Sequence, residues 1–362
     1  MHDLQGRAAQ AQLIYIQDFS IGFTRKKCGK GFKYIDSNGR AITDKKIRDR
    51  ILSLVIPPAW REVWICMDQD GHIQATGFDD AGRKQYIYHP RWHEASSLHK
   101  YGRLKEFGSL LPTIRRKVQI DLVGDELTKR RVVAAVVRLL DKACIRIGNK
   151  QYLEANDSRG ATTLTSDHVT CNKSEITLDF KGKSGKQVQL QCHDEGLAAV
   201  IEDCEKSDGE FLFSYPNHAG EIIPVTSADV NAYLIEISKN PVTAKDFRTW
   251  RGSLVAFKHL CAMADGLSKT AKKRYITEGV KLAAAALNNT PAVCRRSYIH
   301  SALLAAAEAE TLTQIMRDLE SSLKPFKRRT GLKQDEIRLM AFLAHLEEAG
   351  QLPAAVALAD AA

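Results

Sequence analysis

Residues 289–299 read Asn-Thr-Pro-Ala-Val-Cys-Arg-Arg-Ser-Tyr-Ile. Thr290 is a good helix cap, and Pro291 suits the first helical position because its missing N–H would be unpaired there anyway. The stretch predicts a helix that runs on to Leu312 and carries Tyr298 two turns from its start. A tyrosine on such a helix is most often a packing residue, so its chemical role has to be decided by the rest of the chain.

The composition is that of an ordinary globular protein with a basic surplus. The chain has 362 residues, 44% of them hydrophobic and 27% charged, with a formal net charge of +10. This length can hold two domains, each with its own core. The surplus of positive charge makes nucleic acid the first partner to consider and acidic lipid the second.

The cysteines and the chain start predict a location in the cytoplasm. The eight cysteines include no C-x-x-C pair, and several stand in apolar runs, so we expect buried free thiols in a reducing compartment rather than a zinc site. The first residues lack the charged and apolar regions of a signal peptide. No apolar run reaches the roughly 18 residues of a membrane span.

Residues 12–100 have the texture of short strands separated by turns. Strands are predicted at 13–16, 32–35, 63–67, 72–78 and 85–88, with a helix capped by Asp44 and ending near Leu54. Residues 25–50 hold ten Lys or Arg against three Asp, with aromatic residues interleaved. Such a stretch fits either a surface that follows phosphates or a solvated basic face.

From about residue 98 the pattern becomes helical. A helix at about 126–145 is apolar nearly all round, which predicts burial at the centre of a domain, with Gly148 as its C-cap. Arg146 lies between two isoleucines after this helix and needs a partner, since an unpaired buried charge is costly. Period-two strands follow within 162–192, joined by a basic hairpin tip at 181–186. Further helices are predicted near 195, at 226–238, 253–264, 269–287 and 334–348, with a basic joint at 324–333 and a frayed small-residue tail.

Five phrases occur in an order that resembles the type IB DNA topoisomerases, in particular their poxvirus-like and bacterial branch. They are Arg83-Lys84-Gln85-Tyr86-Ile87-Tyr88, Ile145-Arg146-Ile147-Gly148-Asn149-Lys150-Gln151-Tyr152-Leu153, Phe180-Lys181-Gly182-Lys183, Lys245-Asp246-Phe247-Arg248-Thr249, and Thr290-Pro291 followed by Arg296-Ser297-Tyr298. The resemblance covers roughly residues 20–310.

The resemblance implies an α+β fold with two domains. A small amino-terminal domain with an antiparallel sheet would occupy residues 1–98. A larger, mostly helical catalytic domain with a small sheet, of the kind shared by tyrosine recombinases and type IB topoisomerases, would occupy 99–362. The family closes these domains as a clamp around duplex DNA, which implies a monomer associated with the nucleoid.

The residue types fit the chemistry that the resemblance implies. A free tyrosine has a pKa near 10 and needs help to attack a phosphodiester. Two guanidinium groups, those of Arg146 and Arg248, suit the charge that builds on the non-bridging oxygens. Lys183 is the candidate general acid for the leaving 5′-oxygen. The family implies a 3′-phosphotyrosine intermediate on Tyr298, strand rotation and religation, with no metal and no ATP; the sequence lacks a phosphate-binding loop motif.

The chain departs from the viral and eukaryotic pattern at Asn289, where those proteins have His. Asn can donate an N–H to a phosphate oxygen but cannot pass a proton, so we predict hydrogen-bond donation there. The resemblance also assigns DNA contacts in the amino-terminal domain to Arg83, Lys84, Gln85, Tyr86 and Tyr88.

Two alternatives stay open at this point. A tyrosine recombinase shares the fold and nucleophile, but usually has His where this chain has Lys245, and lacks the amino-terminal sheet domain. A DNA-binding protein without catalysis would keep the basic surface and form no covalent adduct; the complete set of Arg, Lys, Arg and Tyr argues against it.

Overall fold

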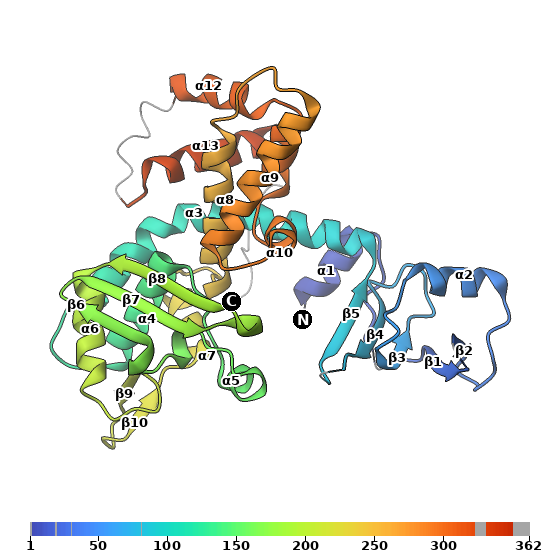
Figure 1. The fold of residues 1–362 in the computed structure, drawn as a ribbon, viewed down its shortest axis with the longest axis horizontal. Coiled ribbons are helices and arrows are strands. Elements are labelled where there is room, and N and C mark those ends of the chain that lie inside the picture. The colour runs from blue at the N-terminus through green and yellow to red at the C-terminus, as the bar shows by residue number, and fades with distance from the viewer. Residues whose placement is uncertain (1, 19, 30, 81, 323–330, 350–362) are drawn as a thin grey trace. The chain divides into compact units, whose positions relative to one another are not determined.

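A computed structural model describes residues 2–18, 20–29, 31–80, 82–322 and 331–349, with side chains for all of these except 2, 3, 93–102, 321 and 322. The fold mixes helices with antiparallel sheets (Figure 1). The chain divides into two compact units, Met1–Lys100 and Tyr101–Ala362. The boundary predicted after residue 98 falls inside one long helix, α3 (Pro90–Asp121). Among the described residues, no helix is both long and apolar enough to cross a membrane.

The first unit is built on a five-stranded antiparallel sheet in the order β2-β1-β3-β4-β5. Phe23, Val63 and Ile65 point from the sheet into its core, which α2 covers with Ile51. Asp44 caps α2, as predicted, by accepting a hydrogen bond from the Ile47 N–H at 3.1 Å. The elements of this unit are α1 (His2–Gln10), β1 (Phe23–Cys28), β2 (Gly31–Ile35), α2 (Lys45–Ser53), β3 (Arg61–Ile65), β4 (Ile73–Phe78) and β5 (Lys84–Tyr88).

The strand predicted at residues 13–16 is wrong. Ile14 forms only an isolated parallel bridge with Gly71. The Ile16 N–H, which could extend this bridge into a ladder, donates to Nδ1 of His72 at 3.0 Å rather than to a carbonyl. A side chain thus replaces the next ladder hydrogen bond, and the segment does not extend into a strand.

The second unit combines a three-stranded antiparallel sheet, β6-β7-β8, with a two-stranded pair and a set of helices. Its strands are β6 (Val169–Asn172), β7 (Glu175–Lys181), β8 (Gln187–His193), β9 (Ser214–Pro216) and β10 (Ile222–Pro224). Its helices after α3 are α4 (Lys129–Ala143), α5 (Lys150–Asn156), α6 (Glu195–Glu205), α7 (Ser227–Ser238), α8 (Ala244–Leu260), α9 (Lys269–Ala286), α10 (Pro291–Ser297), α11 (Ser301–Glu308), α12 (Leu312–Ser322) and α13 (Gln334–Glu348), with short 3-10 turns η1 (Ala161–Thr163), η2 (Ser166–His168) and η3 (Lys183–Gly185).

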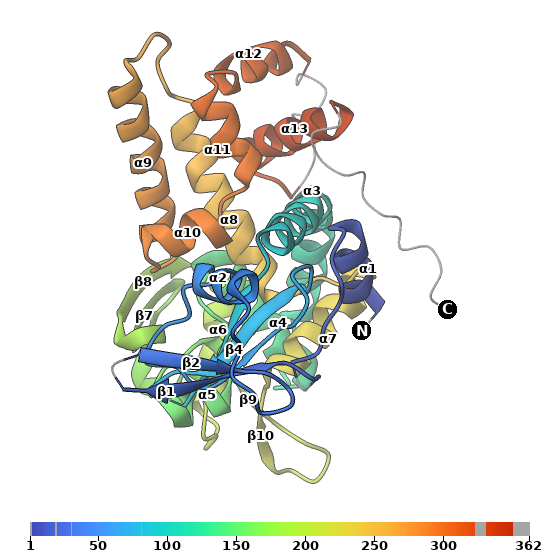
Figure 2. The same ribbon diagram turned by 90° about the vertical axis from the view of Figure 1, so that its right-hand side faces the viewer.

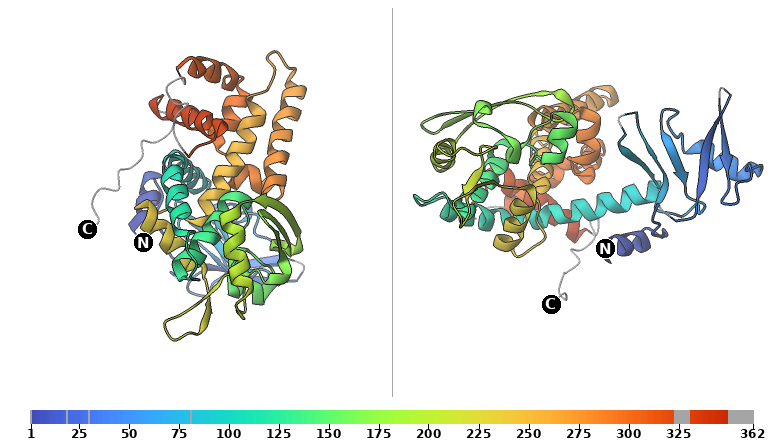
Figure 3. Two further views of the ribbon diagram at one scale, coloured as in Figure 1. Left: turned by 90° about the vertical axis from the view of Figure 1, so that its left-hand side faces the viewer. Right: turned by 90° about the horizontal axis from the view of Figure 1, so that it is seen from below.

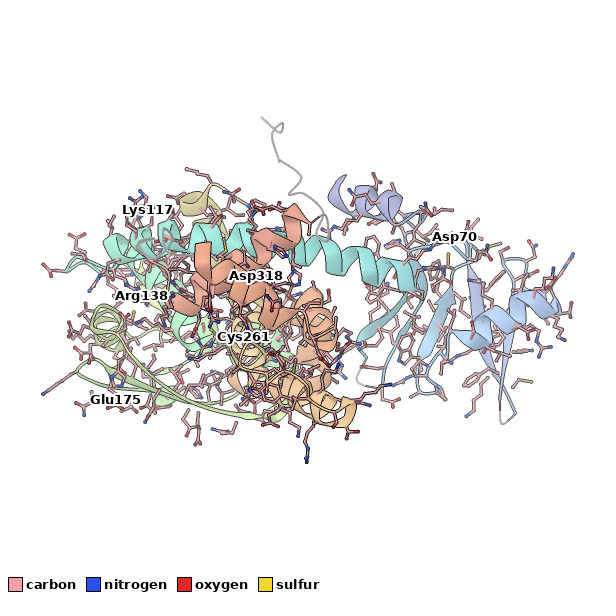
Figure 4. The ribbon with its side chains drawn as sticks, turned by 90° about the horizontal axis from the view of Figure 1, so that it is seen from above. Asp70, Lys117, Arg138, Glu175, Cys261 and Asp318 are labelled. Atoms are coloured by element: carbon pink, nitrogen blue, oxygen red, sulfur yellow. The ribbon has the colours of Figure 1, made fainter. Side chains whose placement is uncertain are left out.

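The β7–β8 hairpin and the α8–α9 pair place the candidate site. Lys181 pairs with Gln187 at the tip end of the hairpin, and Glu175 pairs with His193 at the other end, where Figure 4 labels Glu175. Helices α8 and α9 lie side by side (Figures 2 and 3). The core of the unit includes α4, in which every residue from Arg131 to Val137 is buried, as its apolar sequence predicts.

Two predicted helix boundaries in this unit are wrong. Helix α4 ends at Ala143 with Cys144 as its C-cap in the left-handed conformation, φ 52°, so Gly148 is not its cap. The Cys144 carbonyl accepts a hydrogen bond from the distant Arg248 side chain, which only the folded chain supplies. Helix α8 begins at Ala244 rather than near 253, and Arg248 therefore lies inside a helix.

The helix predicted at 334–348 is present as α13 and belongs to the core of the second unit. Its Glu336 is 2% exposed and accepts hydrogen bonds from Arg115 at 2.8 and 2.9 Å and from Trp250 Nε1 at 3.2 Å. Arg115 also pairs with Asp141 of α4 at 2.8 Å. One partly buried ion cluster thus holds α13 against α3, α4 and α8. Most of the predicted basic joint and all but the start of the predicted tail lie outside the described residues.

Candidate active site

Tyr298 stands at the end of a short helix, not within a long one. Thr290 caps α10 as predicted, with its Oγ1 accepting from the Val293 N–H at 3.4 Å, and Pro291 is the first helical residue. The helix stops at Ser297, and Tyr298 is its C-cap with φ −135° and ψ −8°. A new helix, α11, begins at Ser301. The predicted continuous helix to Leu312 is therefore wrong.

Contacts from α8 explain why the chain turns here. Ser253 Oγ donates to the Tyr298 carbonyl at 3.2 Å and accepts from the His300 N–H at 3.0 Å. The preceding residue, Gly252, has no side chain to obstruct this approach: a Cβ there would lie 2.6 Å from the Tyr298 carbonyl oxygen. His300 in turn caps α11 by accepting from the Ala302 N–H at 3.2 Å. The main chain of Tyr298 is thus seated directly on the helix that carries Arg248.

Arg248 joins the ends of two other helices. Its side chain is 4% exposed, and it donates from Nη1 to the Cys144 carbonyl and from Nη2 to the Leu287 carbonyl at 2.7 Å. These carbonyls follow α4 and α9, where the helix dipoles leave partial negative charge that stabilises a buried cation. Nε of Arg248 is buried and has no hydrogen-bond partner among the described residues.

Arg146 finds its partner in Asn289. Nη2 of Arg146 donates to Oδ1 of Asn289 at 2.6 Å, between residues 143 apart in the sequence. Because a guanidinium group can only donate, this contact fixes the oxygen of the amide toward Arg146. Nδ2 of Asn289 is then left buried, with no partner among the described residues. The amide therefore keeps its NH2 group as a donor for a ligand.

The two arginines bring uncompensated positive charge to the Tyr298 phenol. Neither Arg146 nor Arg248 forms an ion pair with a carboxylate in the described part of the chain. The guanidinium carbon of Arg248 lies 5.2 Å from the centre of the Tyr298 ring. Burial alone would raise the pKa of Tyr298, but Arg248, Arg146 and Lys245 outweigh it and hold the pKa below its ordinary value. Burial, and then the charge of Arg248, lower the pKa of Arg146. The arrangement suits an anion.

Lys245 is a site residue that the sequence reasoning did not select. It lies one turn before Arg248 on α8, and its charge is among those that lower the pKa of Tyr298. Three residues of spacing on a predicted helix would have placed it beside Arg248. The prediction missed it because α8 was expected to begin later. By contrast, Arg295, three residues before Tyr298, pairs with Glu308 at 2.8 Å on the surface.

Lys183 is not joined to the other predicted residues by a hydrogen bond or an ion pair in the described part of the chain. It begins the turn η3 at the tip of the β7–β8 hairpin, and its side chain is exposed. No hydrogen bond or ion pair joins it to another described residue. Gly182, however, lines the same hollow as Arg146 and Arg248. The tip end of the hairpin thus borders the site, and Lys183, the residue after Gly182, carries the amine.

The residues predicted to contact DNA in the first unit lie together on β5 or just before it. Arg83 pairs with Asp79 at 2.8 Å, Lys84 with Asp18 at 2.5 Å, and Gln85 donates to Asp79 at 3.0 Å. Tyr86 is 42% exposed and stacks on the half-buried Tyr88, with ring centres 5.8 Å apart. The two tyrosines share one face of the strand, and Tyr86 is the more accessible.

Two arginines of the basic stretch 25–50 serve the fold. Arg25 donates to the carbonyls of Ile56, Pro57 and Trp60 at 3.1, 3.0 and 2.7 Å. Arg50 donates to Gln74 at 2.8 Å and to the Cys66 carbonyl. These two guanidinium groups are therefore structural, whereas Lys26 and Lys33 are exposed and directly opposite each other across β1 and β2.

Comparison with known families decides the relationship. The family model of the eukaryotic DNA topoisomerase I catalytic core matches residues 89–324, which is more than half of the chain. The model of the bacterial DNA topoisomerase IB N-terminal domain matches residues 31–79. The chain belongs to the type IB DNA topoisomerase family.

Individual DNA topoisomerases show the same relationship. DNA topoisomerase 1B of Acanthamoeba polyphaga mimivirus is 32% identical over 288 residues, which cover 77% of this chain and 85% of the viral protein. DNA topoisomerase 1B of vaccinia virus (strain Copenhagen) is 22% identical over 236 residues, which cover 63% of this chain and 70% of the viral protein. DNA topoisomerase 1 alpha of Arabidopsis thaliana is 24% identical over 64% of this chain but only 25% of the plant protein.

Asn289→Ala is expected to slow single-turnover DNA cleavage by about ten- to a hundredfold, the loss that follows when a hydrogen bond to a charged group is removed. Asn289→His should cost less because an imidazole keeps an N–H donor, and only this variant should add a rate step near pH 6–7.5. Thermal melting distinguishes a helix-cap role, although Thr290 already caps α10. Parental cleavage by Asn289→Ala would remove this residue from the type IB catalytic set.

Lys26→Gln combined with Lys33→Gln is expected to weaken DNA binding. The two lysines are like charges directly opposite on paired strands, an arrangement that an anion between them would relieve. Removing one lysine–phosphate interaction should reduce the log–log salt slope of binding by about one. Lys206→Gln, which removes an exposed lysine already paired with Asp203 at 2.9 Å, is the control. An unchanged slope in the double variant would mean that the stretch is a solvated face.

Proposed function

We propose that the protein relaxes supercoiled duplex DNA by the type IB reaction, without ATP or a metal ion. Tyr298 would attack a backbone phosphorus, forming a 3′-phosphotyrosine bond and breaking the bond to the 5′-oxygen. Rotation of the broken strand and attack by the freed 5′-hydroxyl would restore the DNA. The two units would close around the duplex as a clamp, with the protein acting as a monomer on the cytoplasmic nucleoid.

The observation that supports this proposal most is the charge around Tyr298. Burial would raise the pKa of this phenol, but Arg248, Arg146 and Lys245 outweigh it and lower the pKa, which makes the phenolate more accessible near neutral pH. The two guanidinium groups have no carboxylate partner among the described residues, and so remain available for the non-bridging oxygens of a phosphodiester. Asn289 Nδ2 offers a further neutral donor.

The remaining proton transfer falls to Lys183. The 5′-oxygen is a poor leaving group unless it gains a proton. The ammonium group of Lys183, on an exposed hairpin tip, can reach a bound strand and donate that proton. The phenolic proton of Tyr298 is lost to solvent, so the proposed step needs no further protein base. The Lys183 amine would take the proton back when the 5′-hydroxyl attacks in religation.

Relaxation of a negatively supercoiled plasmid in the presence of EDTA and the absence of ATP tests the proposal directly. The expected result is a ladder of topoisomers, together with a covalent protein–DNA adduct when detergent stops the reaction. The adduct should carry the 3′ end of the broken strand. Binding without relaxation or adduct would contradict the proposal and favour a DNA-binding protein without catalysis.

Lys183→Ala is expected to slow cleavage of ordinary DNA by about a hundredfold or more, the scale of losing a general acid. A substrate with a 5′-thiolate leaving group should restore most of the rate, because sulfur leaves without a proton. Lys181→Ala, at the neighbouring hairpin position where Lys181 pairs with Asp157 at 2.7 Å, is the matched control. Equal loss on both substrates would show that Lys183 is not the acid.

A further inference from the structure

Asn288 connects the Lys183 hairpin to the segment that leads to Tyr298. Its Nδ2 donates to the main-chain carbonyl of Gln187 at 3.0 Å, between residues 101 apart in the sequence. Gln187 is the first residue of β8 and pairs with Lys181 at the base of the hairpin tip. Asn288 itself immediately precedes Asn289, the partner of Arg146. One side-chain hydrogen bond therefore joins the segment after α9 to the start of β8, and both segments border the site.

Besides this bond, the described residues show hydrogen bonds within the hairpin tip and further contacts at its base. Within the tip, Gly182 N–H donates to the Lys186 carbonyl at 2.8 Å and Gly185 N–H to the Gly182 carbonyl at 3.1 Å, which fixes its shape. On one side, the Arg159 N–H donates to the Lys181 carbonyl at 2.9 Å, and the Lys181 ammonium group pairs with Asp157 at 2.7 Å. On the other side stands Asn288. The tip is thus a preformed turn held at its base from two sides, and Asn288 provides the hold on the side of the nucleophile.

The backbone alone does not account for asparagine at this position. Asn288 follows the end of α9 with φ 46°, in the left-handed region. Its N–H bonds to the Ala285 carbonyl at 3.0 Å. Glycine adopts this conformation at least as well as asparagine does. What asparagine adds is the amide that reaches Gln187.

We propose that Asn288 is a positioning residue that holds the Lys183 hairpin against the Tyr298 segment, so that the amine meets the leaving 5′-oxygen. The proposal rests on the general-acid role proposed for Lys183. In the proposed mechanism, Asn288 touches neither DNA nor the reacting atoms. Its effect on the rate passes entirely through the position of the acid, and this makes the effect separable from that of Arg146 or Arg248.

Asn288→Gly is the informative change, because it removes the amide and keeps the left-handed backbone. We expect single-turnover cleavage of ordinary DNA to slow by about three- to tenfold, the population change that loss of one partly exposed hydrogen bond produces. Cleavage of the 5′-thiolate substrate should stay at the parental rate. Hydrogen–deuterium exchange should become faster in peptides covering 181–187 and stay unchanged in α4.

The outcomes separate the tether from the function it serves. Equal slowing on both substrates, or parental cleavage with unchanged exchange at 181–187, would overturn the role of Asn288. If Lys183→Ala itself shows no selective rescue by the thiolate, the proposed acid is wrong; faster exchange at 181–187 in Asn288→Gly would then still establish the tether. A melting temperature for Asn288→Gly at or above the parental value would exclude loss of the α9 end as the cause.

Discussion

Tyr298→Phe is expected to abolish the covalent protein–DNA adduct and plasmid relaxation while DNA affinity stays near the parental value. The substitution removes one oxygen, the atom that would form the phosphotyrosine bond. The ring should keep its place because main-chain contacts position this residue. Ser253 binds the Tyr298 carbonyl, and Gly252 allows α8 to approach the Tyr298 main chain closely.

Tyr275→Phe is the matched control for loss of a phenolic hydroxyl in the same unit. Its hydroxyl donates to the His259 carbonyl at 3.1 Å and its ring stacks on His259, within the α8–α9 pair. This variant should lose a little stability and keep cleavage. Detection of a 3′-linked adduct with Tyr298→Phe, trapped by detergent and mapped by peptide sequencing, would sink the assignment of the nucleophile.

The sequence predicts the beginning of the nucleophile helix but not its end. Thr290 and Pro291 are local signals, and both act as expected at the start of α10. The end depends on Ser253 and Gly252, which stand on another helix and leave no trace in the local pattern. A helical periodicity that continues past Tyr298 therefore suggested one helix where the folded chain forms two.

The same distinction separates the predicted site from the observed one. The buried helix α4 follows from its apolar residues, and the hairpin at 181–186 from period-two strands around a polar turn. The contact of Arg146 with Asn289 spans more than a hundred residues of sequence. Arg248 binds the ends of α4 and α9 from a separate helix. Residue types and order indicated the members of the set, and only the fold shows what each one binds. The roles given to these residues remain predictions for the variants to test.

Arg248→Ala is expected to slow single-turnover cleavage by about a hundredfold or more, the typical effect of losing one preorganised donor to transition-state charge. Two of its amino groups already hold the carbonyls of Cys144 and Leu287, which fixes the guanidinium plane and leaves its other N–H groups for the phosphate. Arg248→Lys should recover little, because an ammonium cannot bind both carbonyls and a phosphate oxygen in this geometry.

Stability has to be separated from chemistry in this experiment, since Arg248→Ala leaves two buried carbonyls without their donors. An unsatisfied buried group costs about 1–3 kcal/mol, so the melting temperature should fall. Arg131→Ala provides the matched control. Arg131 is another buried arginine, 6% exposed, which donates to the Leu122 carbonyl at 3.1 Å and to Asp203 at 2.8 Å on α6. Its loss should lower stability and leave the cleavage rate of the folded protein unchanged.

The leaving-group substrate completes the test of Arg248. An arginine that stabilises non-bridging oxygens acts on the phosphorus centre, whatever atom departs from it, so a 5′-thiolate should not restore cleavage by Arg248→Ala. Rescue equal to that of Lys183→Ala would mean that Arg248 works through the leaving group instead. Cleavage at the parental rate, measured below the melting transition, would show that its guanidinium group is needed only to join the ends of α4 and α9.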